Sequence, residues 1–280
     1  MVIVRVSYLG PEGSFSSIIA RTLYPEAVGV PQPSITAAIR LVEAGSADLA
    51  VVPIENSIGG PVTETLMNLS RTLLKVGLAA IYRIELVAAR GGDERVIYGH
   101  SHALSEAWEW VEGLEGYKVS TVSSTSEAAM LASREGGICL CSREAALKYG
   151  LEVIADNVSP RSNYTKFIVL GWRDNPSSNG RTMIITVLKD TPGSLYRFLE
   201  PFAREDLNLT MIYSMPLGSG EWRYLFYIEV DGSRMDKRVE RALREARRRS
   251  LFLTLLGTYP VIELNRDLGE GGTGDGYGSV

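Results

Sequence analysis

Residues 51–60 have the sequence VVPIENSIGG. The first half continues an apolar run that starts at Leu49 and is typical of a buried strand. The run changes abruptly into Glu55, Asn56 and Ser57, followed by two glycines. In open α/β sheets, ligands bind just past the carboxyl ends of the strands. The stretch is therefore either a polar turn in which Ser57 caps the next helix, or one wall of a binding site.

Strand and helix patterns alternate on both sides of this stretch, from residue 2 to about residue 170. Such a repeat predicts a largely parallel sheet, or a pair of sheets, with helices on the faces. We expect residues 1–172 to form two α/β lobes with a cleft between them. The chain is expected to cross to the second lobe near residues 76–90 and to return near residues 155–170.

Two helix starts in this region are rich in hydrogen-bond donors. The turn at residues 10–13 (GPEG) precedes Ser14, and residues 123–126 (SSTS) precede an alanine-rich helix. Free N–H groups and the helix dipole favour an anion at such ends, although a plain strand–turn–helix is the alternative. The first turn lacks the second half of a dinucleotide fingerprint and is not a Walker loop, so nucleotide binding is only weakly indicated.

The pattern changes after residue 172. Residues 173–180 (RDNPSSNG) lack periodicity and are expected to form a linker. Residues 181–262 follow the order βαββαβ, which is the ferredoxin-like unit. The basic run at 234–249 has acids interleaved at helical spacing, which favours a solvated helix face over a nucleic-acid patch. The glycine-rich tail, residues 266–280, is expected to be disordered.

The chain has 280 residues, a net charge of −4 and a pI of about 5.5. This balance argues against a nucleic-acid or membrane-surface partner. Cys139 and Cys141 share one face of a strand pattern, where buried thiols are favoured over a disulfide. With only His100 and His102 besides, we expect no metal site. The N-terminus lacks a signal-peptide layout and no apolar run could span a bilayer, so a cytoplasmic location is expected.

The candidate site is poor in charge apart from Glu55. Its expected members are neutral and polar, and several lie at helix N-termini: Asn56, Ser57, Thr125, Ser126, Asn163 and Thr165. These N–H and O–H donors suit a small ligand that carries carboxylates. They do not suit hydride transfer, phosphoryl transfer or metal-dependent hydrolysis. Because an acid would repel such a ligand, we expect Glu55 to support the loop while Asn56 and Ser57 touch the ligand.

Eight separated stretches together make the chain resemble the prephenate dehydratase family with its regulatory ACT domain. In chain order they are YLGPEGSFS (8–16), PIENS (53–57), STSEAA (124–129), NYTKF (163–167), PGSL (192–195), NLT (208–210), WRYLF (222–226) and LGTYP (256–260). Each stretch alone is a weak signal, but all of them in order are specific. The resemblance covers about residues 2–262 and implies a two-lobed, periplasmic-binding-protein-like catalytic domain followed by a ferredoxin-like ACT domain.

The resemblance implies conversion of prephenate into phenylpyruvate, water and carbon dioxide on the route to phenylalanine, with no cofactor. Thr165 corresponds to the family's candidate proton donor. The residues expected to hold substrate are Asn56, Ser57, Thr125, Ser126, Asn163, Phe167 and His102. Two positions depart from the family pattern. Lys166 replaces an arginine and points away from Thr165 on a strand, so we expect it to have a structural partner, and His102 replaces a glutamine.

For the ACT domain, the resemblance implies that phenylalanine binds as an effector between paired domains. The expected residues are Gly193, Ser194, Leu195, Asn208, Leu209, Tyr213 and Ser214. Tyr213 and Met215 stand where the family has a glutamate and an arginine, which removes an ion pair or a ligand contact. Since ACT domains pair through sheets and helices, a homodimer or homotetramer is expected.

Two other functions remain open at this point. Arogenate dehydratase performs the same chemistry on a substrate with an amino group in place of the side-chain keto group. A non-catalytic amino-acid sensor is the alternative from another class, because a two-lobed cleft and an ACT domain are both binding folds. The presence of Thr165 together with Asn56 and Ser57 argues against the sensor.

Overall fold

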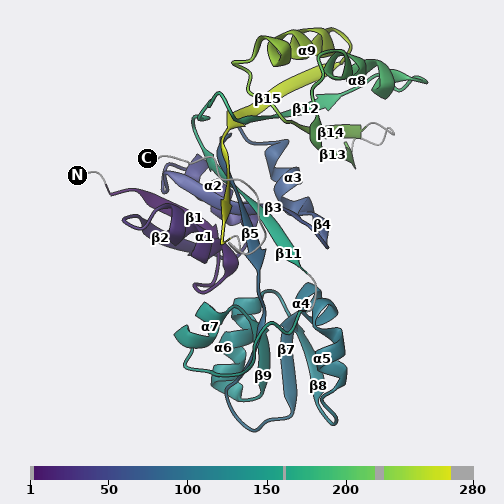
Figure 1. Ribbon diagram of the computed structural model, residues 1–280. Coiled ribbons are helices and arrows are strands. Elements are labelled where there is room, and N and C mark those ends of the chain that lie inside the picture. The colour runs from purple at the N-terminus through teal and green to yellow at the C-terminus, as the bar shows by residue number, and fades with distance from the viewer. Residues whose placement is uncertain (1–2, 160–161, 218–223, 266–280) are drawn as a thin grey trace, which may run out of the picture.

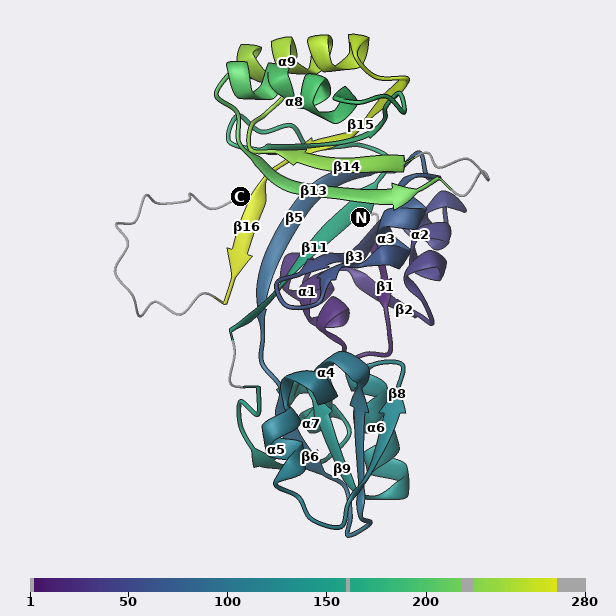
Figure 2. The same cartoon turned by 90° about the vertical axis from the view of Figure 1, so that its right-hand side faces the viewer.

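The computed structural model describes residues 3–159, 162–217 and 224–265. Three sheets are stacked along the molecule, as Figures 1 and 2 show. The ferredoxin-like domain lies at one end, the first α/β lobe in the middle and the second lobe at the other end. The expected α/β class with a two-lobed first part is therefore confirmed.

The first lobe contains a sheet with the strand order β16-β5-β11-β3-β1-β2, and the short β4 pairs with β3. Its strands are β1 (Arg5–Leu9), β2 (Val28–Gln32), β3 (Leu49–Asn56), β4 (Gly60–Pro61), β5 (Lys75–Ile84), β11 (Asn163–Gly171) and β16 (Val261–Leu264). Its helices are α1 (Phe15–Leu23), α2 (Ile35–Glu43) and α3 (Thr63–Leu69). Helix α2 forms because Ser34 caps it and its apolar residues share one buried face: Ile35, Ala38, Ile39 and Val42.

The second lobe contains a smaller sheet with the order β10-β6-β9-β7-β8. Its strands are β6 (Val87–Arg90), β7 (Val96–His100), β8 (Lys118–Val122), β9 (Ile138–Cys141) and β10 (Glu152–Ala155). Its helices are α4 (Ser101–Glu106), α5 (Trp108–Glu112), α6 (Thr125–Glu135) and α7 (Arg143–Lys148). The chain crosses between the lobes twice, from β5 to β6 and from β10 to β11, and so the cleft lies beside two connecting segments.

The ferredoxin-like domain has the strand order β13-β14-β12-β15. Its elements are β12 (Arg181–Val187), α8 (Ser194–Arg204), β13 (Leu209–Pro216), β14 (Tyr224–Val230), α9 (Lys237–Arg248) and β15 (Phe252–Tyr259). Helices α8 and α9 cover one face of this sheet, around Phe198 and Phe202. The other face packs on the first lobe, where Met183, Ile185 and Tyr227 join that lobe's core. The domain is therefore seated on the first lobe by a continuous apolar contact.

The sequence patterns did not identify the strand that follows the ferredoxin-like unit. Residues Val261–Leu264 form β16, which leaves the ferredoxin-like domain and pairs in parallel with β5 of the first lobe. The boundary expected at residue 262 thus falls inside a strand. Four residues are too few to show a periodic pattern, so only packing against β5 identifies them. The tail at 266–280, which we expected to be disordered, lies outside the described residues.

Two further expectations concern the state of the cysteines and the location of the protein. Cys139 and Cys141 are buried and unbridged, with their sulfurs 3.5 Å apart. Within the described part of the chain, no helix is both long enough and apolar enough to cross a bilayer. The cytoplasmic location stays a prediction.

Candidate active site

A cavity of about 220 Å³ between the two lobes brings together most of the residues expected from the sequence. The first lobe contributes the ends of β1, β3 and β11 and the start of α1, and the second contributes α4 and the start of α6. This size suits a small molecule. The expected residues that line the cavity are Asn56, His102, Thr125, Asn163, Thr165 and Phe167.

Two antiparallel strands place the central polar residues. Strands β3 and β11 pair so that Thr165 lies opposite Asn56, and the register shifts between Lys166 and Phe167. Irregularities of this kind occur beside active sites, where they re-aim side chains. The extra residue of this irregularity is in β3, while β11 is regular here, so simple alternation puts Thr165 and Phe167 on the cavity side and Lys166 on the side that contacts Glu229 of the ferredoxin-like domain.

The side-chain amide of Asn56 has one hydrogen-bonded orientation. Its Oδ1 accepts from the backbone N–H groups of Ile58 at 3.0 Å and Gly59 at 2.7 Å. Its Nδ2 therefore faces β11 and donates to Oδ1 of Asn163 at 2.5 Å and to Oγ1 of Thr165 at 2.9 Å. Because the Thr165 oxygen accepts this bond, its own proton remains able to donate into the cavity.

The same network reaches the second lobe at Glu106, a cavity residue that sequence reasoning missed. Nδ2 of Asn163 donates to both carboxylate oxygens of Glu106, at 2.7 and 2.8 Å. Burial raises the pKa of Glu106 above its ordinary value, and the bond from Asn163 and the charge of His102 oppose this rise in part. Since residues four apart share one face of a helix, the spacing from His102 was the signal that could have identified Glu106.

His100 and His102 lie at the start of α4 and line the cavity. Their ring centroids are 5.2 Å apart, and burial together with the charge of His102 lowers the pKa of His100. A Cβ atom on Gly59 would lie 2.7 Å from Cε1 of His102, so a larger residue at position 59 would require this ring to move. Among the residues that the structure describes, no group of three or more His, Cys, Asp or Glu could hold a metal ion.

Two helix N-termini, one from each lobe, border the cavity. Ser14 caps α1 by accepting the N–H of Ser17 at 3.2 Å, and Ser124 caps α6 by accepting the N–H of Glu127 at 3.1 Å. Ser14, Ser124 and Thr125 all line the cavity. The remaining N–H groups of each first turn have no acceptor within their own helix, and the helix dipole adds positive charge there. Both helix starts therefore favour an anionic group in the cleft.

Ser57 and Ser126 were expected to touch a ligand, and the structure gives both of them other partners. Oγ of Ser57 accepts the N–H of Tyr164 at 2.9 Å, and the N–H of Ser57 donates to the Tyr164 carbonyl at 2.8 Å. Ser126 is fully buried and donates to the carbonyl of Glu12, across the lobes, at 2.8 Å. Neither serine lines the cavity. The Ser57 hydroxyl joins the end of β3 to β11, and the Ser126 hydroxyl joins the second lobe to the first.

Glu55 and Lys166 contact the ferredoxin-like domain. Nζ of Lys166 lies 3.2 Å from a carboxylate oxygen of Glu55 and 3.0 Å from one of Glu229 in β14. Arg181 also reaches Glu229 at 3.2 Å, and the hydroxyl of Tyr213 donates to Glu55 at 2.7 Å. We call these five residues the interdomain cluster. They confirm that Glu55 supports its loop and that Lys166 has a structural partner.

The carboxylate of Glu229 is completely buried within this cluster. Burial alone would raise its pKa, but Lys166 and the hydroxyls of Thr210 and Tyr259 hold the pKa below its ordinary value. Thr210 donates to the carboxylate at 2.5 Å and Tyr259 at 2.7 Å. Burial and an acidic partner also raise the pKa of Tyr213 to about 12, so its hydroxyl remains a donor at neutral pH.

The residues expected to bind phenylalanine are divided between two places. Gly193 has a φ of 79° at the start of α8, and the hydroxyls of Ser194 and Thr191 are 2.7 Å apart. The exposed members are Gly193, Leu195, Asn208 and Ser214, and Leu209 is half-buried. Tyr213 contacts the first lobe through its hydroxyl, and strand alternation puts it on the opposite face of β13 from Ser214. Tyr213 therefore does not share a surface with Ser214.

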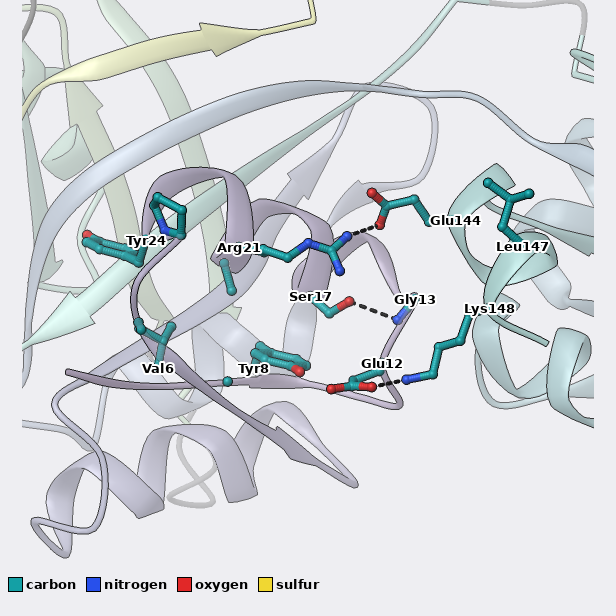
Figure 3. Close-up of a pocket in the computed structure, with 14 residues that line it drawn as sticks. Val6, Tyr8, Glu12, Gly13, Ser17, Arg21, Tyr24, Glu144, Leu147 and Lys148 are labelled. Atoms are coloured by element: carbon teal, nitrogen blue, oxygen red, sulfur yellow. Dashed lines mark hydrogen bonds and ion pairs between the residues drawn. The ribbon is translucent and has the colours of Figure 1, made fainter. Parts of the chain in front are cut away.

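A larger cavity, of about 390 Å³, lies between α1 and α7 (Figure 3). Two ion pairs cross it from one lobe to the other, Arg21 with Glu144 at 2.6 Å and Lys148 with Glu12. Its charges thus already neutralise one another, and none of the expected site residues lines it. The smaller cavity is the candidate active site because the polar network and both helix N-termini converge there.

The fold is that of a two-lobed α/β protein with a ferredoxin-like domain, and two helix N-termini border the cavity between its lobes. The chain matches the prephenate dehydratase family model over residues 6–175 and the ACT domain model over residues 182–248. The chain belongs to the prephenate dehydratase family. A bifunctional chorismate mutase/prephenate dehydratase of Aquifex aeolicus is 34% identical over 268 residues, which cover 92% of this chain and 74% of that protein.

Two solved structures are similar over nearly the whole chain. The prephenate dehydratase of Arthrobacter aurescens, solved in complex with L-Phe, is 32% identical with a TM-score of 0.82, covering 92% of this chain and 90% of that one. GqqA, described as a novel type of quorum-quenching acylase, is 26% identical with a TM-score of 0.83, covering 92% of this chain and 98% of that one.

Proposed function

We propose that this chain catalyses the decarboxylative dehydration of prephenate to phenylpyruvate. The observation that carries the proposal is the meeting of the Asn56–Asn163–Thr165 network with two helix N-termini in one small cavity. Prephenate has two carboxylates, which suit the two helix starts, and a ring hydroxyl, which suits a hydroxyl donor. Family membership supports the same reaction.

In this reaction two bonds to the ring break. The ring carboxylate leaves as carbon dioxide, and its bonding electron pair enters the ring as the hydroxide departs from the opposite carbon. The ring becomes aromatic, and the hydroxide takes up one proton to leave as water. Since aromatisation supplies the driving force, the protein has to orient the dianion, exclude water and assist the departing hydroxide.

Thr165 is the proposed donor to the departing oxygen. Its oxygen accepts a hydrogen bond from Asn56, which leaves the hydroxyl proton to point at the ligand. A threonine hydroxyl is a weak acid, so it acts through a strong hydrogen bond or a relay instead of releasing a free proton. Phe167, Leu86 and Ile84 supply an apolar wall that keeps water away from the ring.

The direct test is to incubate the purified chain with prephenate and to measure phenylpyruvate and carbon dioxide. We expect both products in equal amounts without added metal or cofactor. Binding of prephenate without any product would overturn the proposal and would support the non-catalytic sensor.

We also propose that phenylalanine inhibits the enzyme by binding between paired ACT domains near Leu195 and Ser214. Two observations support this. The edge strand β13 has no further strand beside it among the described residues, and Ile212 and Ser214 on it are exposed. Sheet edges of this kind readily pair with a second chain. A homodimer or homotetramer by light scattering and phenylalanine binding by calorimetry are expected, and a monomer that neither binds phenylalanine nor responds to it would refute the proposal.

The similarity to GqqA raises amide hydrolysis as a second activity. Acyl transfer by a hydroxyl nucleophile requires a general base within hydrogen-bond reach. Within the described part of the chain, no serine or threonine hydroxyl of the cavity donates to His100 or His102; Nδ1 of His100 accepts the N–H of His102 at 3.3 Å. The geometry therefore favours dehydration, and an assay with an acyl-homoserine lactone alongside prephenate compares the two directly.

A further inference from the structure

Glu106 is the one acid among the described residues that line the cleft, and no lysine or arginine lines it. The carboxylate is half-buried on α4, at the point where the second lobe meets β11. Each of its two oxygens accepts from the same Nδ2 of Asn163. The Ser159 hydroxyl also acts on this carboxylate and lowers its pKa. Four lone-pair sites are available on a carboxylate, so these neutral partners leave room for a donor from a ligand.

The orientation of the network makes Glu106 an acceptor. Asn56 donates to Oδ1 of Asn163, and this leaves only the Asn163 amide N–H groups to face Glu106. Unlike Asn56 and Thr165, which can be satisfied by neutral groups, an ionised Glu106 is best satisfied by a cation. Neither substrate carboxylate provides one, whereas a substrate ammonium group would.

Arogenate and prephenate differ at one group only. Prephenate has a keto group in its side chain and two negative charges, while arogenate has an ammonium group there and a net charge of −1. We propose that Glu106 is a specificity-determining residue that pairs with the ammonium group of arogenate and disfavours prephenate, so that the cleft accepts arogenate as a substrate. This inference rests on the proposed dehydratase function and assigns the substrate class of the same site.

The protonation state of Glu106 then acts in opposite directions on the two substrates. Burial raises its pKa, so the carboxylate is more often neutral than an exposed one at mildly acid pH. Ionisation as the pH rises adds a negative charge beside dianionic prephenate but provides the partner for an ammonium group. Among the described residues, the titratable group that acts on Glu106 is His102 on its own helix, while Asn163 of β11 and Ser159 are neutral partners.

The test compares kcat/KM for arogenate and for prephenate in the wild type, Glu106→Gln and Glu109→Gln. Glu109 is exposed on α5 and serves as the matched control. Glutamine keeps the shape and an acceptor but has no charge, so we expect Glu106→Gln to lower kcat/KM for arogenate at least ~10-fold, the low end for a bond between charged groups. The loss should lie mainly in KM, and the ratio of kcat/KM for arogenate to that for prephenate should fall in Glu106→Gln but not in Glu109→Gln.

A second measurement needs no variant. In the wild type, the ratio of kcat/KM for arogenate to that for prephenate should rise as the pH rises through the pKa of Glu106, and this rise should shrink in Glu106→Gln. An unchanged ratio in Glu106→Gln, with prephenate still consumed, overturns the role of Glu106 and leaves the dehydratase function intact. Turnover of neither substrate by the wild type would instead refute the dehydratase function itself.

Discussion

The two faces of the β3–β11 pair carry opposite kinds of chemistry, although their residues alternate in the sequence. Asn56 and Thr165 point into the cleft and join a network of neutral amide and hydroxyl groups. Their neighbours Glu55 and Lys166 belong to the interdomain cluster, where charges are paired with one another. One pair of strands therefore forms both a wall of the cleft and the seat of the ACT domain.

The two regions differ in whether their charged side chains are paired with one another. Among its described lining residues the cleft has one carboxylate, Glu106, and no ion pair, so a substrate meets mainly neutral donors that are already oriented. The interdomain cluster buries the Glu229 carboxylate beside two cations of the cluster, and the hydroxyls of Thr210 and Tyr259 also donate to it. Changes on the cleft face should consequently alter turnover and leave stability nearly unchanged, while changes on the other face should alter stability first.

The largest effect is expected from Thr165→Ala on the cleft face. Loss of the hydroxyl donor should lower kcat by at least ~100-fold, the low end for positioned acid–base assistance, with little change in the free energy of unfolding. Thr165→Ser keeps the hydroxyl and is the control, expected to retain most of the activity. Steady-state kinetics with prephenate measure both, and near-normal turnover in Thr165→Ala would remove Thr165 from the mechanism.

On the opposite face, Lys166→Met should destabilise the protein because Glu229 keeps a buried charge with one cation fewer. We expect a loss of about 2 kcal/mol, below the roughly 3–5 kcal/mol typical when a buried pair loses a partner, since Arg181 remains. Urea unfolding measures the change, with Lys189→Met, on an exposed residue, as the control. An unchanged midpoint in Lys166→Met would show that the cluster does not hold the domains together.

The pH dependence of the unfolding free energy tests whether the interdomain cluster contains a buried ionised carboxylate. The pKa of Glu229 is held below its ordinary value in the folded chain, so its stabilising contribution is present above the unfolded pKa and is lost as the pH falls through the folded pKa. We expect the difference in unfolding free energy between the wild type and Glu229→Gln to shrink progressively below about pH 4.5. A difference that stays constant from neutral to acid pH would contradict the ionised state of Glu229.

A smaller loss is expected from Tyr213→Phe, which removes one hydrogen bond from the interdomain cluster. Its donor serves a partly exposed carboxylate that keeps Lys166 as a partner, so we expect about 1 kcal/mol. Tyr196→Phe, on an exposed tyrosine of α8, is the matched control. If both variants unfold at the same denaturant concentration, the contact between Tyr213 and Glu55 contributes nothing to docking.

The smallest effect should come from the exposed ion pair between Lys148 and Glu12, which crosses the larger cavity. Solvent screens such pairs, so Lys148→Ala should cost less than ~1 kcal/mol, and the difference should fall further at high salt. Thermal unfolding at low and high salt measures it. A loss as large as that of Lys166→Met would mean that exposed and buried pairs hold this molecule together equally.

Local patterns identified much of the molecule. Alternation along residues 163–167 predicted that Thr165 and Lys166 face opposite sides, and the β3–β11 pair shows this. The sequence also indicated hydroxyl-rich helix starts at Ser14 and Ser124, and both border the cavity; that they bind an anion stays a prediction. These predictions succeeded because strand alternation and capping depend on neighbours within a few residues.

Hydrogen-bond partners that lie in distant segments of the chain could not be predicted from the sequence. Ser57 and Ser126 have the residue type of a ligand contact, yet they bond to Tyr164 and Glu12 because packing brings those backbones within reach first. Glu106 enters the site only because α4 of the second lobe meets β11. The residues next to Glu106 in the sequence do not indicate that Nδ2 of Asn163 lies 2.7 Å from its carboxylate.

The sequence by itself determined the α/β class, the change to a βαββαβ unit after residue 172, the family, and several of the neutral polar residues that line the cleft. The tertiary structure alone decided that Glu106 joins the cleft, that β16 returns to the first lobe and that Lys166 is matched by Glu229, 63 positions away in the chain. The physical reason is that periodicity specifies which face a side chain occupies, whereas the group it meets there depends on how separate elements pack.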